Sequence, residues 1–231
     1  MIDERTLDVR RLGVVPYLAA WELQRELATQ RAADEIPDTL LLLEHPPTYT
    51  IGRSGGHDHL LVDRAEIEAH GGSVIEVDRG GDITYHGPGQ LVGYPILQIK
   101  NHGRDLHAYL RMLEQVLIEV LATYELAGRR FLGYTGVWLD DQKIAAIGIR
   151  VNARGVTSHG FALNISTNLA DFTAIVPCGI SDYGVTSLAA ILPNPPCLDE
   201  VCERVEQAFG RVFLLGVRGS GLGFRLATSA L

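Results

Sequence analysis

Residues 79–94, with the sequence RGGDITYHGPGQLVGY, constrain the fold of this chain more than any other segment, because five glycines and one proline interrupt a strand-like sequence. Glycine lets a backbone approach a ligand where a Cβ atom would collide, and it reaches positive φ at little cost. The same composition is also typical of a mobile surface turn. The flanks favour a buried site, since residues 83–85 and the apolar run 90–99 are strand-like. Arg79 and His86 are then the side chains placed to act on what the loop holds.

The length and composition predict one domain, residues 1–231, with a substantial core, since 46% of the 231 residues are hydrophobic. No apolar run approaches the ~20 residues that span a bilayer. The first residues, MIDERTLDVRR, carry charges where a signal peptide needs an apolar segment, and three cysteines are too few for a disulfide framework. We therefore expect a soluble, cytoplasmic protein that does not bind membranes. Residues 216–231 are glycine-rich and then small and apolar, and the sequence leaves their order open.

Helical and strand-like spacings alternate along the chain and predict an α/β (α+β) fold, a single domain with a mixed sheet and flanking helices. In residues 105–126, leucines recur at three- and four-residue intervals, which indicates a long amphipathic helix. Asp63 is suited to cap a short helix that stops before Gly71. Further helices are expected at 16–34, 63–70, 186–192 and 198–209, and strands at 39–44, 73–77, 136–139, 144–151 and 156–165.

The glycine-rich segment and several other motifs resemble the octanoyl/lipoyl transferase family, also called lipoate protein ligase B. In chain order these motifs are EHPPTYTIGR at 44–53, RGGDITYHGPGQ at 79–90, GVWLDDQKIAAIG at 136–148, HGFALN at 159–164 and Pro177-Cys178-Gly179. Several motifs in one order are more specific than any one of them. The resemblance implies the fold of the catalytic domains of biotin and lipoate protein ligases. It also implies an acyltransferase that moves octanoyl or lipoyl groups in lipoate biosynthesis.

Cys178 is the candidate nucleophile. Pro177 fixes the preceding φ, and Gly179 leaves room for a substrate carbonyl beside backbone N–H groups. An isolated cysteine is more often a small buried hydrophobe, and this interpretation suits Cys197 and Cys202. For Cys178 the resemblance implies a different role, because it places the acyl-accepting cysteine of the family in this Pro-Cys-Gly setting.

A nucleophilic cysteine needs a nearby positive charge or a base, because a thiol is weakly ionised near neutral pH. Spacing alone makes Lys143 a solvated charge on a hairpin turn at 140–143. The resemblance instead implies that Lys143, which precedes an apolar segment ending in Gly148, pairs with Cys178. The thiolate would attack an acyl thioester, and Lys143 would protonate the leaving thiol. Neutral Lys143 would then deprotonate an incoming lysine, which attacks the acyl-enzyme to give an amide.

The resemblance also implies that three segments bind the acyl chain. An octanoyl chain contains about six methylenes, and burying them at ~0.8 kcal/mol each contributes roughly 5 kcal/mol, so a tunnel can set affinity and chain length. Taken singly, His86 and His159 are more typical of structural residues that bridge backbone groups. The expected pocket residues are Arg79, Gly80, Gly81, Asp82, Ile83, Thr84, Tyr85, His86, Ala146, Ile147, Gly148, His159, Gly160 and Phe161.

The net charge of −8 argues against nucleic acid as a partner. The resemblance implies two kinds of partner. One is an acyl carrier protein that carries octanoyl-phosphopantetheine, and the other is a lipoyl domain of the 2-oxoacid dehydrogenase complexes or the glycine cleavage H protein. These partners are acidic, so a local basic patch is expected to offset repulsion. The candidates are Arg129, Arg130, Arg150 and Arg154, which are equally typical of ordinary solvated surface.

We expect no cofactor, neither ATP nor metal. The transfer of an acyl group from a thioester to an amine runs downhill without ATP. No GxxxxGK[ST] loop is present, and residues 52–56 lack the fuller GRGRxGR pattern of biotin ligases. The histidines lack HExxH spacing and the cysteines lack CxxC spacing. Two alternatives remain open, an ATP-dependent lipoate or biotin ligase and a non-catalytic acyl-binding module.

Overall fold

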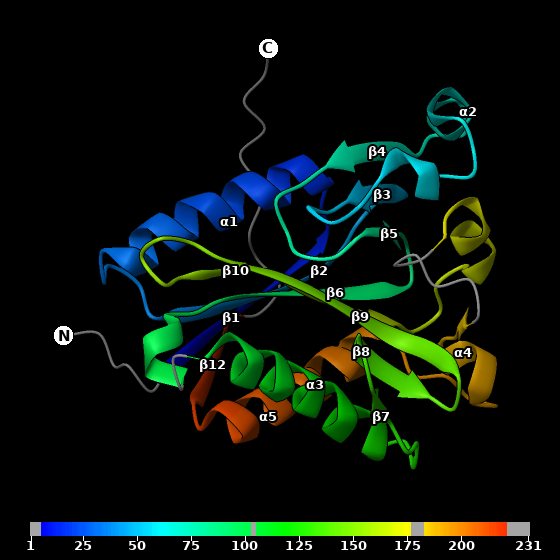
Figure 1. Cartoon of the computed structure of the whole chain (residues 1–231). Helices are drawn as coiled ribbons and strands as arrows, with labels where there is room; N and C mark the ends of the chain where they lie inside the picture. Colours follow the sequence, from blue (N-terminus) through cyan, green and yellow to red (C-terminus); the bar gives the residue numbers. More distant parts are fainter. Residues whose placement is uncertain (1–5, 103–104, 177–182, 221–231) are drawn as a thin grey trace.

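The computed structural model describes residues 6–102, 105–176 and 183–220, and within them a nine-stranded mixed sheet forms the centre of the molecule (Figure 1). Its strands are β1 (Thr6–Val14), β2 (Asp38–Glu44), β6 (Gln90–Ile96), β7 (Arg129–Phe131), β8 (Tyr134–Leu139), β9 (Gln142–Val151), β10 (Thr157–Asn164), β11 (Gly184–Val185) and β12 (Gly216–Ser220). They lie in the order β12-β1-β2-β6-β10-β9-β8-β7, and β11 pairs with β9. β1 is parallel to β12 and β2, and β11 is parallel to β9, whereas β6 to β10 pair antiparallel with their neighbours.

Helices cover both faces of this sheet (Figure 1). On one face packs α1 (Tyr17–Ala32), and on the other pack α3 (Leu106–Ala122) and α5 (Leu198–Phe213). Two shorter segments, η2 (Ile99–His102) and α4 (Leu188–Ile191), join these layers. In the described part of the chain, no helix combines the length and apolarity needed to cross a membrane.

Strand β2 shows how one apolar run serves both faces. Successive side chains of a strand point to opposite faces of the sheet. Leu40 and Leu42 accordingly pack in the core with α3 and α5, whereas Leu41 and Leu43 pack in the core with α1. All four are at most 1% exposed. The strand is therefore apolar at every position from 40 to 43, rather than at alternate positions.

A second sheet of three strands lies beside the first (Figure 1). Its order is β4-β3-β5, and β5 pairs antiparallel with β3. The chain then passes through residues 87–89 directly into β6 of the large sheet. The glycine-rich segment is thus the connection between the two sheets. The elements of this part are β3 (Thr48–Ile51), η1 (His57–His59), α2 (Arg64–Ala69), β4 (Ser73–Glu76), β5 (Ile83–His86) and η3 (Leu169–Ala174).

The expected helices and strands are confirmed with small shifts at their ends. Asp63 caps α2 by accepting a hydrogen bond from the backbone N–H of Ala65. The helix expected at 105–126 ends at Ala122, because Glu125 adopts φ +61 and the N–H of Leu126 reaches back to a carbonyl of the last helical turn. No strand was expected at β1, β3, β7, β11 or β12. Of the stretch 216–231, residues 216–220 form β12, and the remainder lies outside the described residues.

Asp38, the first residue of β2, joins three elements through its buried carboxylate. It accepts hydrogen bonds from Arg31 Nε at 2.7 Å, from the backbone N–H of Gln98 at 3.1 Å and from His102 Nε2 at 2.6 Å. Its side chain is 1% exposed. Burial alone raises the pKa of Asp38, but the hydrogen bonds from His102, Arg31 and Gln98 outweigh burial, and the net pKa lies below the usual value. The folded state is therefore stabilised by the charged carboxylate.

We expect Asp38→Ala to lower the free energy of unfolding by about 3–5 kcal/mol near neutral pH, because it leaves a buried guanidinium without its buried partner. The folded pKa lies below the unfolded one, so this difference should be full above the ordinary pKa of 3.8 and shrink as the pH falls below it. Urea unfolding at several pH values measures both effects. Asp34→Ala serves as the control. The Asp34 carboxylate also pairs with Arg31, but its side chain is 66% exposed, so its removal should lower the free energy of unfolding only slightly. Equal losses in the two variants would contradict the interpretation.

Candidate active site

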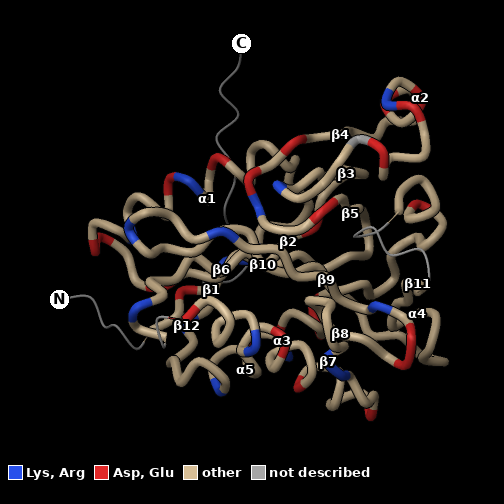
Figure 2. Tube along the Cα trace, in the orientation of Figure 1, with Lys and Arg blue, Asp and Glu red and all other residues tan. Residues whose placement is uncertain are grey.

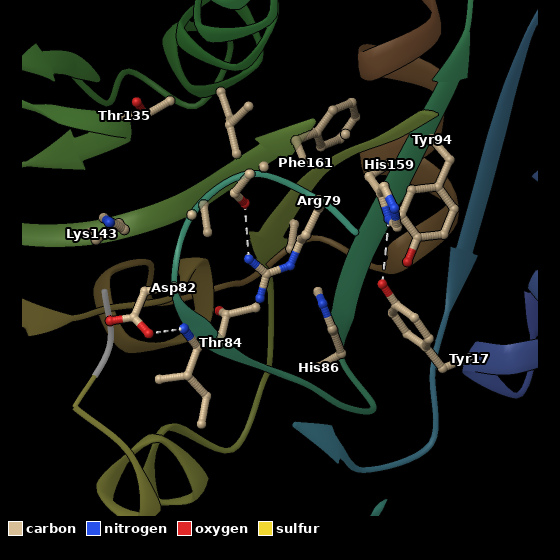
Figure 3. A pocket seen from close by; sticks show the side chains of 18 residues that line it. Tyr17, Arg79, Asp82, Thr84, His86, Tyr94, Thr135, Lys143, His159 and Phe161 are labelled. Atoms are coloured by element: carbon tan, nitrogen blue, oxygen red, sulfur yellow. Dashed lines mark hydrogen bonds between the residues drawn. The ribbon is translucent and has the colours of Figure 1, made fainter. Parts of the chain in front are cut away.

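One cavity lies where the two sheets meet, and thirteen of the fourteen expected pocket residues line it (Figure 3). It encloses about 510 Å³ of space, part of it open to solvent. The expected residues on the lining are Arg79, Gly80, Gly81, Asp82, Ile83, Thr84, His86, Ala146, Ile147, Gly148, His159, Gly160 and Phe161. The remaining lining residues are Tyr17, Tyr94, Thr135, Lys143 and Ala162.

Strand register explains why segments far apart in sequence meet at this cavity. β9 and β10 are antiparallel, and Gly148 lies opposite Gly160 while Ile147 lies opposite Phe161. The third segment is tied to the same strand, because the N–H of Gly80 donates to the carbonyl of Ile149 at 2.9 Å. Three motifs therefore share one strand, β9, as their common support.

The glycines of these motifs allow backbones to approach closely. A Cβ atom at Gly148 would lie 2.9 Å from the carbonyl oxygen of Gly80, and one at Gly160 would lie 2.1 Å from that of Gly93. Real Cβ atoms do not come this close to a carbonyl, so a side chain at either position would force the backbones apart. Gly81 has a different requirement, since its φ of +86 is the left-handed conformation that favours glycine.

Arg79 fastens the glycine loop to β3 of the small sheet. Its Nη2 donates to the carbonyl and the hydroxyl of Thr50 at 2.7 and 2.8 Å. Its Nη1 donates to the carbonyl of Gly80 at 3.1 Å. The side chain is buried although it carries a charge. A planar guanidinium can serve several acceptors at once, which makes Arg79 a clamp for this loop.

Lys143 is buried at the edge of the cavity, contrary to what its spacing alone indicated. It is the second residue of β9 and is 7% exposed. Its Nζ lies 4.8 Å from the centroid of the Trp138 ring, within the range of a cation–π interaction. Lys143 also lines an open groove beside the cavity, together with Leu106, Leu110 and Tyr134. The amine therefore stands where solvent-accessible space and the cavity meet.

The predicted nucleophile, Cys178, lies outside the described residues, as do Pro177 and Gly179. The pairing of Cys178 with Lys143 therefore stays a prediction. The other two cysteines are described, and neither lines the cavity. Cys202 lies on the buried face of α5, where burial raises the pKa of its thiol to about 12. Such a thiol is not ionised near neutral pH, which agrees with a packing role.

The two candidate histidines both line the cavity and make defined hydrogen bonds. Nδ1 of His86 donates to Oε1 of Gln90 at 2.8 Å, and Nε2 of His159 donates to Oδ1 of Asp78 at 2.7 Å. Burial lowers the pKa of both, so both are neutral near neutral pH. Tyr85 is the one expected pocket residue that is not on the lining. Its hydroxyl donates to Asp171 at 2.7 Å, within the core of the small sheet.

The four arginines expected to form a basic patch are dispersed. Arg129 and Arg130 lie on β7, whereas Arg150 and Arg154 lie at the far end of β9 and in the turn after it. Three of them pair with carboxylates. Arg129 pairs with Asp141, Arg130 with Glu114, and Arg150 with Asp78. Figure 2 shows Lys and Arg interspersed with Asp and Glu along the trace. The docking role of these arginines stays a prediction.

Comparison with known proteins gives a family. Residues 16–210 match the model of the lipoyl protein ligase A/B catalytic domain. An octanoyltransferase from Chloroflexus aurantiacus is 51% identical over 220 residues, which cover 94% of this chain and 99% of that protein. An octanoyltransferase from Rubrobacter xylanophilus is 52% identical over 223 residues, which cover 95% of this chain and 99% of that protein.

Solved structures share the fold. The crystal structure of a lipoate-protein ligase A bound with ATP superposes with a TM-score of 0.71 at 16% sequence identity, covering 94% of this chain and 89% of that one. At this identity the likeness concerns the fold alone. It confirms the mixed α/β fold of lipoate protein ligases that the motifs predicted.

We expect Gly148→Ala to shift the preferred ligand of the cavity towards shorter chains and to lower the free energy of unfolding by about 1–3 kcal/mol, because its Cβ displaces the loop at Gly80. Displacement of a fluorescent fatty acid by straight-chain acids of six to twelve carbons measures the preference. The control is Gly219→Ala on β12, where a Cβ meets nothing within 4 Å. An unchanged preference in folded Gly148→Ala would show that this close contact does not shape the cavity. Gly81 is less suited to the test, since its positive φ penalises any side chain.

Proposed function

The chain belongs to the lipoyl protein ligase A/B catalytic-domain family, and from this premise we propose that it is an octanoyltransferase of lipoate biosynthesis. In this proposal it moves an octanoyl group from an acyl carrier protein to a lysine of a lipoyl domain. The observation that carries the proposal is the single cavity on which three motif segments and Lys143 converge. The near-complete coverage of octanoyltransferases at about half identity supports the same reaction class.

The cavity suits an acyl chain with its carbonyl group near Lys143. Ala146, Ile147 and Ala162 line the same cavity as Lys143 and are apolar, and the two alanines leave space for a chain. Burying about six methylenes contributes roughly 5 kcal/mol, which is sufficient to hold the chain while the carbonyl reacts. The open groove on the other side of Lys143 offers a path for the thioester end of the donor.

The first half-reaction is an exchange of thioesters. The thiolate of Cys178 attacks the octanoyl carbonyl carbon, and the bond from that carbon to the carrier sulfur breaks. The ammonium of Lys143 supplies the proton that the leaving carrier thiol takes up. The acyl group is then held as a thioester on Cys178, and Lys143 is neutral. The cation–π contact with Trp138 positions the Lys143 amine at the edge of the cavity.

The second half-reaction forms an amide. Neutral Lys143 takes a proton from the ammonium of the acceptor lysine, and the resulting amine attacks the thioester carbon. The attacking nitrogen loses a second proton to solvent as the bond from carbon to the Cys178 sulfur breaks, which gives the amide and restores the thiolate and the protonated Lys143. The enzyme is unchanged over the cycle, and the thioester supplies the driving force.

The main alternative is an ATP-dependent ligase of the same fold. The backbone hydrogen bonds of residues 52–54 argue against this alternative. Phosphate-binding loops offer free backbone N–H groups to the anion. Here the N–H groups of Gly52, Arg53 and Ser54 donate to carbonyl oxygens of residues 79–82 at 3.0–3.2 Å. Those three donors are committed to the neighbouring loop, which supports a transferase that works without nucleotide. Activity with octanoic acid that depends on ATP would favour the ligase instead.

We expect Cys178→Ala to abolish both octanoyl transfer and the acyl adduct, because the thiolate is the acyl acceptor. Intact mass measurement after incubation with octanoyl-carrier protein detects the adduct. Cys197→Ala, which changes an exposed cysteine outside the cavity, is the matched control and should retain the adduct. Octanoyl transfer by Cys178→Ala would disprove the covalent route, and binding without any adduct in the parent would favour an acyl-binding module.

Lys143→Arg should form the acyl-enzyme at a reduced rate and then stall. Arginine keeps a positive charge beside the thiolate, but it stays protonated near neutral pH and cannot deprotonate the acceptor lysine. Lys143→Ala should be slow in both steps. Rapid-quench measurement of acyl-enzyme formation, with separate measurement of its decay after addition of lipoyl domain, resolves the steps. If Lys143→Arg consumes the acyl-enzyme as fast as the parent, another group is the base.

A further inference from the structure

The end of the cavity opposite Lys143 is closed by aromatic side chains. In Figure 3, Lys143 lies at one end, Arg79 lies in the middle, and Tyr17, Tyr94 and His159 lie together at the other end. The three closing residues line the cavity and are at most 3% exposed. An acyl chain whose carbonyl group is near Lys143 therefore extends its methyl end towards this wall.

The wall is held by hydrogen bonds whose donors can be assigned. On one side, the hydroxyl of Tyr17 donates to Nδ1 of His159 at 3.5 Å, because Nε2 of His159 donates to the carboxylate of Asp78 at 2.7 Å. The peptide N–H of His159 donates to Gln24 Oε1 at 2.7 Å, which holds this residue at its φ of +57. His159 is therefore fixed from several directions and cannot yield to a longer chain.

The other side of the wall is fixed in the same manner. The hydroxyl of Tyr94 donates to Nε2 of His45 at 2.7 Å. Nδ1 of His45 donates to the carbonyl of Val15 at 2.7 Å, which leaves Nε2 as the acceptor. The Tyr17 ring stacks on His86 with centroids 5.8 Å apart, and its centroid lies 4.9 Å from that of His45. The Tyr17 ring thus fills the space between the two hydrogen-bonded sides.

The polar groups of the wall are uncharged near neutral pH, which makes them compatible with a hydrocarbon end. Burial lowers the pKa of His45 to about 4 and also lowers the pKa of His159. Burial raises the pKa of Tyr17 to about 12, and it also raises the pKa of Tyr94 well above its ordinary value. Their polar atoms are engaged with one another, so a methyl group meets ring faces and satisfied hydrogen bonds.

Tyr17 is the member of the wall that can be shortened with least disturbance. Removing the Tyr94 side chain would leave Nε2 of His45 buried without its donor, and removing that of His159 would deprive Asp78 of one of its two partners, the other being Arg150. The hydrogen bond of Tyr17 is the longest in the wall, at 3.5 Å. Tyr17 is also the first residue of α1, so a substitution there does not interrupt the helix.

We propose that the ring of Tyr17 sets the upper limit of acyl-chain length by closing the cavity opposite Lys143. This inference rests on the proposed function and adds a specificity-determining residue to it. Replacing the ring by a methyl group should open space for about two more methylenes. Each additional methylene that becomes buried should raise the affinity for the acyl chain by about fourfold.

The test measures the rates at which four proteins use octanoyl, decanoyl and dodecanoyl thioesters as substrates. The proteins are the parent, Tyr17→Ala, Tyr17→Phe and Trp21→Ala. The kcat/KM for decanoyl relative to octanoyl should rise about fifteenfold in Tyr17→Ala. Tyr17→Phe keeps the ring, so its ratio should stay within about twofold of the parent. Trp21 is one turn further along α1 and contacts His159 without lining the cavity, so Trp21→Ala is the matched control with an unchanged ratio.

Three results would overturn the inference. One is a parental ratio in folded Tyr17→Ala, and the second is an equal rise in Tyr17→Phe, which would assign the effect to the hydroxyl. The third is an equal rise in Trp21→Ala, which would indicate a loosened helix. Tyr17→Leu replaces Tyr17→Ala if the latter does not fold, with a smaller expected rise. If the parent transfers no acyl group at all, the proposed function fails, and displacement of a fluorescent fatty acid by free acids of eight to twelve carbons still tests the wall.

Discussion

The close approach of three backbone segments around Gly80 is the constraint on which the site depends. The N–H of Gly80 donates to the carbonyl of Ile149 on β9, and a Cβ at Gly148 would lie 2.9 Å from the Gly80 oxygen. On the opposite side, a Cβ at Gly52 would lie 2.3 Å from the oxygen of Gly81. Side chains are excluded at these contacts, so the loop can bridge the small sheet and the large one. The cavity is the space that remains beside this bridge.

The local part of this arrangement could be predicted from the sequence. The motif segments at 146–148 and 159–161 fall on adjacent strands joined by a short turn, so antiparallel pairing alone brings them together. The run at 39–44 was recognised as a buried strand because it is apolar at successive positions. β1 escaped prediction, since its sequence TLDVRRLGV buries only Leu7 and Val9 and carries half-buried charged residues beside them. Its place in the sheet comes from pairing with β2 and β12, which is information that no local pattern contains.

Sequence reasoning missed two of the three residues at the far end of the cavity, Tyr17 and Tyr94, although it included His159. Tyr94 lies at the end of the glycine-rich segment, but its position within an apolar run indicated only a core residue. Tyr17 is separated from the glycine-rich segment by more than sixty residues and begins a helix, where an aromatic side chain usually indicates packing. Cross-strand pairing within one hairpin explains the burial of Lys143. Its neighbours in sequence are a turn and an apolar strand, whereas its burial depends on Trp138 across the β8–β9 pair.

A buried guanidinium in a cavity for an apolar chain needs a physical reason, and the contacts of Arg79 provide one. Nη2 donates to the carbonyl and hydroxyl of Thr50, and Nη1 donates to the carbonyl of Gly80. These neutral oxygens, which belong to the segments that meet at the loop, stabilise the buried guanidinium. Lysine would offer the charge without the planar fork and would leave buried carbonyls without donors. The glycines allow the loop to come close, and Arg79 holds it there. Arg79 thus places a charged side chain on the lining of the cavity, and its hydrogen bonds also hold the loop in the position that keeps the apolar space open.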